Sequence, residues 1–217
     1  MSSFRHRFLD LALRLNVLRF GDYTLKSGRQ SPYFFNAGLI NTGAALAELG
    51  SAYAHTLQAS GLPYDMLYGP AYKGIALASA CAIALAQTHA RDVPFAFNRK
   101  EAKDHGEGGL LIGAPLQGRV VIIDDVISAG TSVRESVQMI RAHGATPAAV
   151  LIALDRQERG QGERSAAQEV AADYALPVLA IANLGELLSY VAQRPDLAEQ
   201  LPRLQAYRER YGVDGSG

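Results

Sequence analysis

The 217-residue sequence has one cysteine, no tryptophan and no excess of either charge. The lone Cys81 has no partner for a disulfide, so we expect a buried, inert thiol in a protein of the reducing cytoplasm. Lys+Arg and Asp+Glu number 21 each, which argues against a protein that holds nucleic acid by bulk charge, although a local basic patch is compatible with this balance. No uncharged apolar run approaches the roughly 18 residues of a membrane-spanning helix, so no membrane partner is expected.

Two nucleotide-binding motifs are also missing. Neither G-x-x-x-x-G-K-[ST] nor G-x-G-x-x-G occurs in the sequence, which argues against a P-loop protein and a dinucleotide-binding protein. Hydrophobic residues, by contrast, make up 48% of the chain, enough to bury a sizeable core. We therefore expect a single domain over residues 1–217.

Helical and strand-like patterns alternate along the chain. Hydrophobic spacing predicts helices at 4–15, 43–60, 74–88, 132–143, 164–174 and 184–211. Short apolar runs predict strands at 65–69, 94–98, 119–125, 148–155 and 177–183. This alternation indicates an α/β fold with a central, mostly parallel sheet flanked by helices. Residues 17–40 and 99–113 do not follow it, and long irregular loops in compact domains are often functional.

The most informative stretch is VVIIDDVISAGTS at 120–132. Its apolar strand ends in Asp124 and Asp125, and ligands of open α/β sheets bind beyond the carboxyl ends of the strands. Successive strand residues face opposite sides, so the backbone must turn here if both carboxylates serve one ligand. The small residues that lead into the next helix let backbone N–H groups surround a phosphate. The pattern fits a phosphorylated sugar, with an ordinary strand–turn–helix and a capping aspartate as the alternative.

This stretch resembles the phosphoribosyl-pyrophosphate (PRPP) signature of the type I phosphoribosyltransferases. The segments YTLKSGRQSPYFFN, GPAYKG, FNRKEAKDHGEGG and LDRQE resemble, in matching order over nearly the whole chain, the orotate phosphoribosyltransferases. The resemblance implies the type I phosphoribosyltransferase fold, with a small hood built from about 1–40 and the C-terminal part, and a flexible lid loop at 99–113. It also implies transfer of the phosphoribosyl group of PRPP to orotate, which yields orotidine 5′-monophosphate and pyrophosphate in pyrimidine biosynthesis.

The resemblance assigns residues to PRPP. It places Tyr72 and Lys73 in a loop that holds pyrophosphate, often with an unusual peptide conformation; a solvated lysine is the alternative for Lys73. The full PRPP-binding set that it implies is Lys26, Tyr72, Lys73, Arg99, Lys100, Lys103, His105, Asp124, Asp125, Val126, Ile127, Ser128, Ala129, Gly130, Thr131 and Ser132. The residues expected to take part in catalysis are Lys73, Lys103, His105, Asp124 and Asp125.

A second set is implied for orotate. It comprises Lys26, Phe34, Phe35, Ser128 and Arg156. An aromatic wall with Arg and Lys suits a planar carboxylate, while core packing is the alternative for the two phenylalanines. Many relatives carry Thr where Ser128 stands here; the hydroxyl is kept and a methyl is lost, so only its packing is affected.

The charged and Gly-rich 99–113 segment is the predicted lid. By resemblance, Arg99, Lys100, Lys103 and His105 close over the site of the neighbouring subunit, which implies a homodimer; a solvated surface loop is the alternative. Mg²⁺ is the implied cofactor, carried by PRPP, and no protein residue is directly assigned to it as a ligand. Whether His105 donates a proton or only binds phosphate stays open. Rival functions are a phosphoribosyltransferase for another base and a PRPP-sensing regulator, which would need a basic face or a DNA-binding module.

Overall fold

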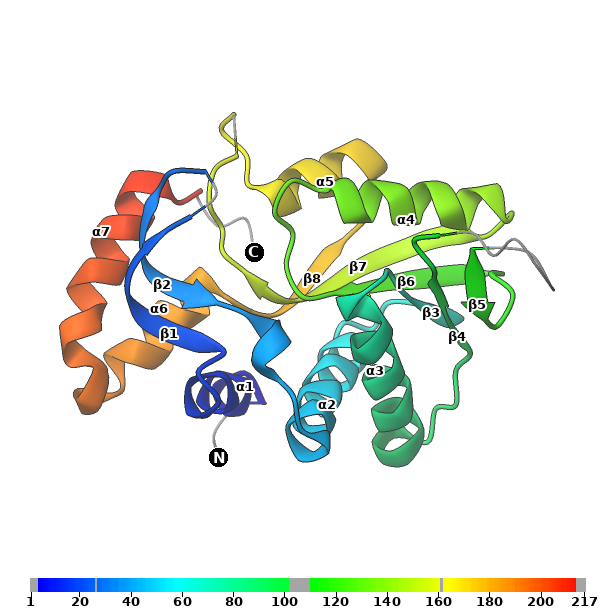
Figure 1. Cartoon of the computed structure of the whole chain (residues 1–217), viewed down its shortest axis with the longest axis horizontal. Helices are drawn as coiled ribbons and strands as arrows, with labels where there is room; N and C mark the ends of the chain where they lie inside the picture. Colours follow the sequence, from blue (N-terminus) through cyan, green and yellow to red (C-terminus); the bar gives the residue numbers. More distant parts are fainter. Residues whose placement is uncertain (1–3, 26, 102–109, 161, 214–217) are drawn as a thin grey trace.

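The computed structural model describes residues 4–25, 27–101, 110–160 and 162–213. A six-stranded sheet lies at the centre of the molecule (Figure 1). Its strands in chain order are β3 (Met66–Gly69), β4 (Phe95–Asn98), β5 (Leu111–Gly113), β6 (Arg119–Asp124), β7 (Thr146–Asp155) and β8 (Val178–Asn183). In space the order is β5-β4-β3-β6-β7-β8, and every pairing is parallel except that of β4 with β5. The predicted α/β class with a mostly parallel sheet is confirmed.

Helices cover both faces of this sheet. Helices α2 (Gly43–Ala59) and α3 (Lys73–His89) lie on one face, and α4 (Thr131–Ala142) and α5 (Ala166–Tyr174) lie on the other (Figure 1). Alternate residues of β6 therefore enter different cores: Val121 packs with the first pair of helices and Ile122 with the second. A strand buried on both faces is apolar without alternation, which explains the run VVII.

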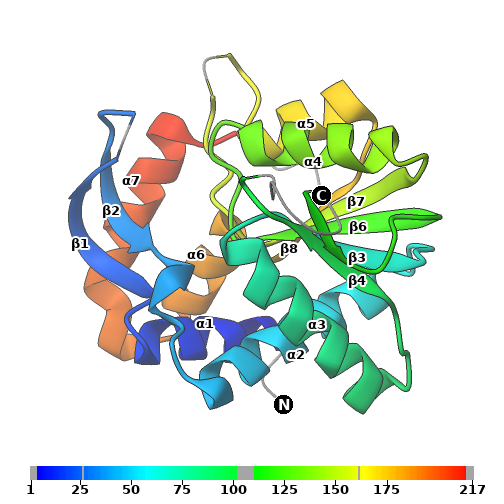
Figure 2. The same cartoon turned by 45° about the vertical axis from the view of Figure 1, so that its right-hand side comes forward.

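A smaller layer is built from both ends of the chain. The antiparallel strands β1 (Leu18–Thr24) and β2 (Gln30–Phe35) lie beside α7 (Leu201–Tyr211), as Figure 2 shows. Helices α1 (Phe4–Arg14) and α6 (Leu184–Ala192) connect this layer to the main core (Figure 2). The prediction of an irregular 17–40 segment is therefore wrong, because most of it forms a hairpin. A register shift between Phe20 and Tyr23 interrupts the alternation that would have revealed β1. The short 3₁₀ segment Ala37–Leu39 follows the hairpin.

Two further boundaries differ from the sequence prediction. The single helix expected at 184–211 is broken: α6 ends at Ala192, a 3₁₀ segment spans Pro195–Gln200, and α7 then begins. Proline lacks an N–H group and disfavours a helical conformation at the preceding residue, and Arg194 is extended here. The loop expected at 99–113 is also too long, because its last three residues form the antiparallel strand β5.

Cys81 lies in α3, fully buried in the main core. Burial raises the pKa of its thiol to about 12, as expected of an inert cysteine. Among the helices that the structure describes, none is long and apolar enough to cross a membrane.

Candidate active site

The acidic pair lies at the carboxyl end of β6. The strand ends at Asp124, and the chain bends at Asp125 just beyond it, as a ligand shared by both carboxylates would need. The two oxygens of the Asp124 carboxylate accept hydrogen bonds from the Asp125 N–H and the Ser132 hydroxyl, both at 2.9 Å. The buried Tyr53 hydroxyl donates to the Asp124 carbonyl at 2.8 Å. Asp124 therefore connects both ends of the loop 125–132.

Burial makes the charge on Asp124 costly. Desolvation, followed by the negative charge of Asp125, raises the pKa of Asp124 to about 6, although the hydrogen bonds from Asp125 N–H and Ser132 oppose the shift. The residues Asp124 and Asp125 are only 8% and 6% exposed. At neutral pH the site therefore keeps an ionised carboxylate that the fold itself disfavours, a feature common in functional sites.

A stability prediction follows from this shift. We expect Asp124→Asn to raise the free energy of unfolding at pH 7 by on the order of 1–2 kcal/mol, because it removes a buried charge. The pKa of Asp124 is raised from 3.8 to about 6 on folding, so its ionisation destabilises the fold increasingly between these values. The difference in free energy of unfolding between Asp124→Asn and the wild type should therefore be largest above pH 6 and vanish below about pH 4.

Urea denaturation of both proteins at pH 4 and pH 7 measures this gain. Asp65→Asn is a matched control, since hydrogen bonds from Arg119 lower the pKa of Asp65 and its exposed carboxylate carries no such cost. Equal stability of wild type and Asp124→Asn at pH 7 would contradict the proposed cost of burial.

Lys73 opens α3 and points at the acidic pair. Its Nζ lies 2.6 Å from Oδ2 of Asp125, while about half of the lysine side chain is exposed. The peptide bond between Ala71 and Tyr72, just before the helix, is cis. The Ala71 N–H donates to the side chain of Asn98 at 2.8 Å, so the end of β4 holds this loop. Asn98 was missed in the sequence, where its position at the end of the apolar run FAF was the available signal.

The same loop lies close to the acidic strand end. A Cβ on Gly74 would be 2.9 Å from the Ile123 carbonyl oxygen and 2.6 Å from Pro70, so only glycine allows this approach. The loop after β3 and the end of β6 therefore lie side by side, which explains how Lys73 reaches Asp125 across 52 residues of sequence.

The predicted phosphate loop has the required backbone. Within the chain segments that the structure describes, no backbone N–H from Val126 to Gly130 donates a hydrogen bond. Gly130 has a φ of +70°, the left-handed conformation that glycine adopts without strain, and α4 begins at the next residue. Ser128, Ala129 and Thr131 are exposed. The loop and the first turn of α4 can thus present several N–H donors to an anion.

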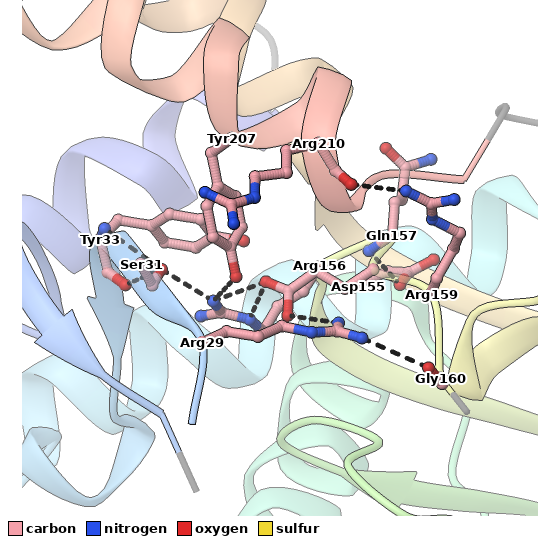
Figure 3. A network of polar contacts seen from close by, with 11 residues as sticks. Arg29, Ser31, Tyr33, Asp155, Arg156, Gln157, Arg159, Gly160, Tyr207 and Arg210 are labelled. Carbon is pink, nitrogen blue, oxygen red and sulfur yellow. Dashed lines mark hydrogen bonds and ion pairs between the residues drawn. The ribbon is translucent and has the colours of Figure 1, made fainter. Parts of the chain in front are cut away.

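Arg156 lies beyond the end of β7, at the meeting point of three segments (Figure 3). Its Nη2 donates to the Ser31 hydroxyl of β2 at 3.0 Å, and its Nε donates to Glu158 at 2.7 Å. Its guanidinium lies 4.2 Å from the centroid of the Tyr33 ring. The Tyr207 hydroxyl of α7 is 3.5 Å from the same Nη2. These four partners were not identified from the sequence.

The two predicted pocket phenylalanines differ in their surroundings. Phe34 lies against Tyr23 and under the Arg19 guanidinium, within the hairpin. Phe35 packs against Phe8 and the main core, as expected of the next residue along a strand. The side chain of Phe35 is therefore partly buried by the core and partly accessible.

The remaining predicted residues divide into two groups. Lys100 is described, with its Nζ 5.1 Å from the Tyr72 ring, and the Arg99 N–H donates to the Leu110 carbonyl. Lys26, Lys103 and His105 lie outside the described residues. No cluster of three or more His, Cys, Asp or Glu that could hold a metal occurs in the part of the chain described here.

The mostly parallel sheet and the loop after β6 indicate the class of protein to which the chain belongs. Residues 40–173 match the family model of the phosphoribosyl transferase domain. The chain is 65% identical to the orotate phosphoribosyltransferase of Laribacter hongkongensis and 59% identical to that of Cronobacter sakazakii, each over 98% of this chain and the full length of the relative. The crystal structure of the Francisella tularensis orotate phosphoribosyltransferase matches with a TM-score of 0.87 and 42% identity, over 95% of this chain and all of the other.

The chain belongs to the orotate phosphoribosyltransferases, the type I phosphoribosyltransferases that transfer the phosphoribosyl group of PRPP to orotate in pyrimidine biosynthesis.

Proposed function

We propose that the carboxyl edge formed by β3, β6 and β7 carries out this transfer with a distinct task for each loop. The loop 126–132 binds the 5′-phosphate of PRPP, and Asp124 and Asp125 bind the ribose hydroxyls. Lys73 and Tyr72, with Arg99, Lys100, Lys103 and His105, bind the diphosphate. The observation that supports this proposal is the buried acidic pair. It lies between the Lys73 ammonium and a loop whose backbone N–H groups are free to donate hydrogen bonds to a ligand.

Mg²⁺ is proposed to enter with PRPP. When bound it would neutralise charge on the departing diphosphate. The donor set fits this route, because Mg²⁺ prefers oxygen, keeps several waters and is often held by substrate phosphates with only one or two carboxylates. The acidic pair offers such carboxylates, whereas no three-residue ligand cluster occurs among the described residues.

The proposed reaction needs no strong base from the protein. An ionised ring nitrogen of orotate forms the new C–N bond, while the anomeric C–O bond to diphosphate breaks and the diphosphate takes the electron pair. The ribosyl centre gains oxocarbenium character between these events, as in glycoside chemistry. The two aspartates then hold the ribose and stabilise positive charge electrostatically. Closure of the proposed lid excludes the water that would otherwise capture this centre.

Orotate is proposed to bind between the phosphate loop and the hairpin. The implied residues are Lys26, Phe34, Phe35, Ser128 and Arg156. The ordered surroundings of Arg156 support this assignment, because a guanidinium held by Ser31 and Glu158 can present its remaining edge to a planar anion.

A homodimer is proposed, in which each lid serves the site of the partner. The exposed side of α3 supports an interface between copies. Ala76, Ile83 and Ala86 recur there at helical spacing with no charge, and Ile83 is 56% exposed. Tyr72, at the start of the same helix, is 69% exposed. A cytoplasmic location is proposed from the single buried thiol, with neither nucleic acid nor membrane as a partner.

Orotate consumption, followed by its ultraviolet absorbance, tests the proposed function. We expect absorbance to fall only when PRPP and Mg²⁺ are both present, and the rate to collapse when EDTA removes the metal. Adenine, hypoxanthine and uracil in place of orotate provide the control for base choice. Consumption of one of these bases but not orotate would indicate the rival transferase, and no consumption of any base would favour a PRPP sensor.

A further inference from the structure

Glu158 is a carboxylate for which the proposed mechanism has no task. It follows Arg156 by two residues in the loop after β7, and its side chain is only 12% exposed. A carboxylate this deeply buried requires compensating partners. It has three such partners: Arg156 in its own loop, Arg29 and Tyr207, and the last two lie beside Arg156 in Figure 3.

The first partner is Arg156 itself. One oxygen, Oε1, accepts a hydrogen bond from Nε at 2.7 Å and forms an ion pair with Nη2 at 2.6 Å. Tyr33 fixes the plane of the guanidinium from one face, and Ser31 fixes the Nη2 end. Nη1 makes no hydrogen bond or ion pair within the described residues. Glu158 therefore turns one edge of the guanidinium inward and leaves the Nη1 edge for a ligand.

The second partner is Arg29, in the turn that joins β1 to β2. Its Nη1 lies 3.8 Å from Oε2 of Glu158, and its Nη2 donates to the Gly160 carbonyl at 3.3 Å. The Arg29 carbonyl also accepts from the Leu25 N–H at 2.9 Å, which closes the turn. In sequence, this is the turn that contains Lys26. One carboxylate thus connects Arg156 to the hairpin turn.

The third attachment comes from the C-terminal helix. The Tyr207 hydroxyl of α7 lies close to Glu158, and desolvation by burial and then the Glu158 carboxylate raise the pKa of Tyr207. The backbone at Glu158 pairs with Gly212 beyond the end of that helix. Arg159 N–H donates to the Tyr211 carbonyl at 2.9 Å. The position of the Glu158 side chain is therefore set by the tertiary structure on both sides, as a positioning residue requires.

We propose that Glu158 is a positioning residue for orotate, which orients Arg156 and holds the hairpin turn beside it. The proposal rests on the proposed role of Arg156 in binding orotate. Glu158 would not touch the substrate. Its effect should therefore fall mainly on orotate, because the PRPP loops after β3 and β6 are held by other contacts.

Steady-state kinetics with each substrate varied in turn tests the proposal. We expect Glu158→Ala to raise the KM for orotate about tenfold or more and to change the KM for PRPP less than about twofold. Glu158→Gln keeps an acceptor for Arg156 but loses the charge, so we expect a rise of only about threefold. If thermal denaturation shows that Glu158→Ala does not fold, Glu158→Gln is used in its place. The proposal then requires a raised KM for orotate and a nearly unchanged KM for PRPP in that variant.

Asp22→Asn is the matched control. Asp22 pairs with Arg203 and so also joins the hairpin to α7, but it touches neither Arg29 nor Arg156. Both KM values should stay unchanged in this variant. An equal rise in both KM values for a folded Glu158 variant, or no rise in either, would overturn the positioning role.

Arg156→Ala separates this inference from the proposed function. A raised orotate KM in Arg156→Ala with an unchanged one in both Glu158 variants would reject only the role of Glu158. An unchanged orotate KM in Arg156→Ala would instead remove Arg156 from the orotate site, and the present proposal with it.

Discussion

Asp125→Asn lowers kcat/KM for PRPP by about 10²- to 10³-fold, at a nearly unchanged fold, if the acidic pair binds the ribose. Asp125 is only 6% exposed, and its carboxylate lies 2.6 Å from the Lys73 ammonium. A charge-assisted hydrogen bond to a ribose hydroxyl contributes roughly 1.5–3 kcal/mol, and each 1.4 kcal/mol is a factor of ten. Loss of one such bond and of charge stabilisation at the ribosyl centre accounts for the expected range.

The fold should survive because the backbone of Asp125 carries its structural contacts. The Asp125 carbonyl accepts a hydrogen bond from the Ala153 N–H at 2.9 Å, and the Asp125 N–H donates to the Asp124 side chain. Neither contact involves the carboxylate of Asp125. Circular dichroism and thermal denaturation of the variant provide the check. Glu48→Gln is the control. It alters an exposed ion pair between Glu48 of α2 and Arg14 of α1, so it should leave kcat/KM unchanged. A wild-type kcat/KM in folded Asp125→Asn would remove the acidic pair from the mechanism.

We expect a mixture of Lys103→Ala and Asp125→Asn subunits to regain activity, although each variant alone should be nearly inactive. If the lid acts across the interface, a hybrid dimer contains one site with both residues intact and one site with neither. Random exchange makes half of the dimers hybrid, so activity should reach up to about a quarter of the wild-type value.

The recovery depends on verified exchange between subunits. Mass spectrometry of differently tagged subunits measures the hybrid fraction, and each variant mixed with itself is the control. Full exchange without recovered activity would mean that each lid serves its own subunit, because every hybrid subunit would then carry one defect. The homodimer could persist in that case, but catalysis would not require it.

The active-site edge was predictable because its signals are local. The strand VVIID, the small-residue loop and the start of α4 are consecutive in the sequence, so the turn at Asp125 and the exposure of Ser128 and Ala129 follow from short-range geometry. Lys73 was identified by resemblance, and the structure places it against Asp125. The β1–β2 hairpin was missed for a local reason as well, since its register shift disrupts the two-residue period.

By itself the sequence determined the α/β class, the five parallel strands of the main sheet, the acidic strand end and the family, because apolar periodicity and contiguous motifs require no knowledge of packing. Only the tertiary structure decided which residues surround Arg156. Ser31 lies 125 positions from Arg156 in the chain and Tyr207 lies 51 positions away, and neither carries a local pattern that points to the other. Such contacts form only when the hairpin, the β7 loop and α7 pack together, because burial of their shared apolar surface, rather than any short-range preference, brings them into reach.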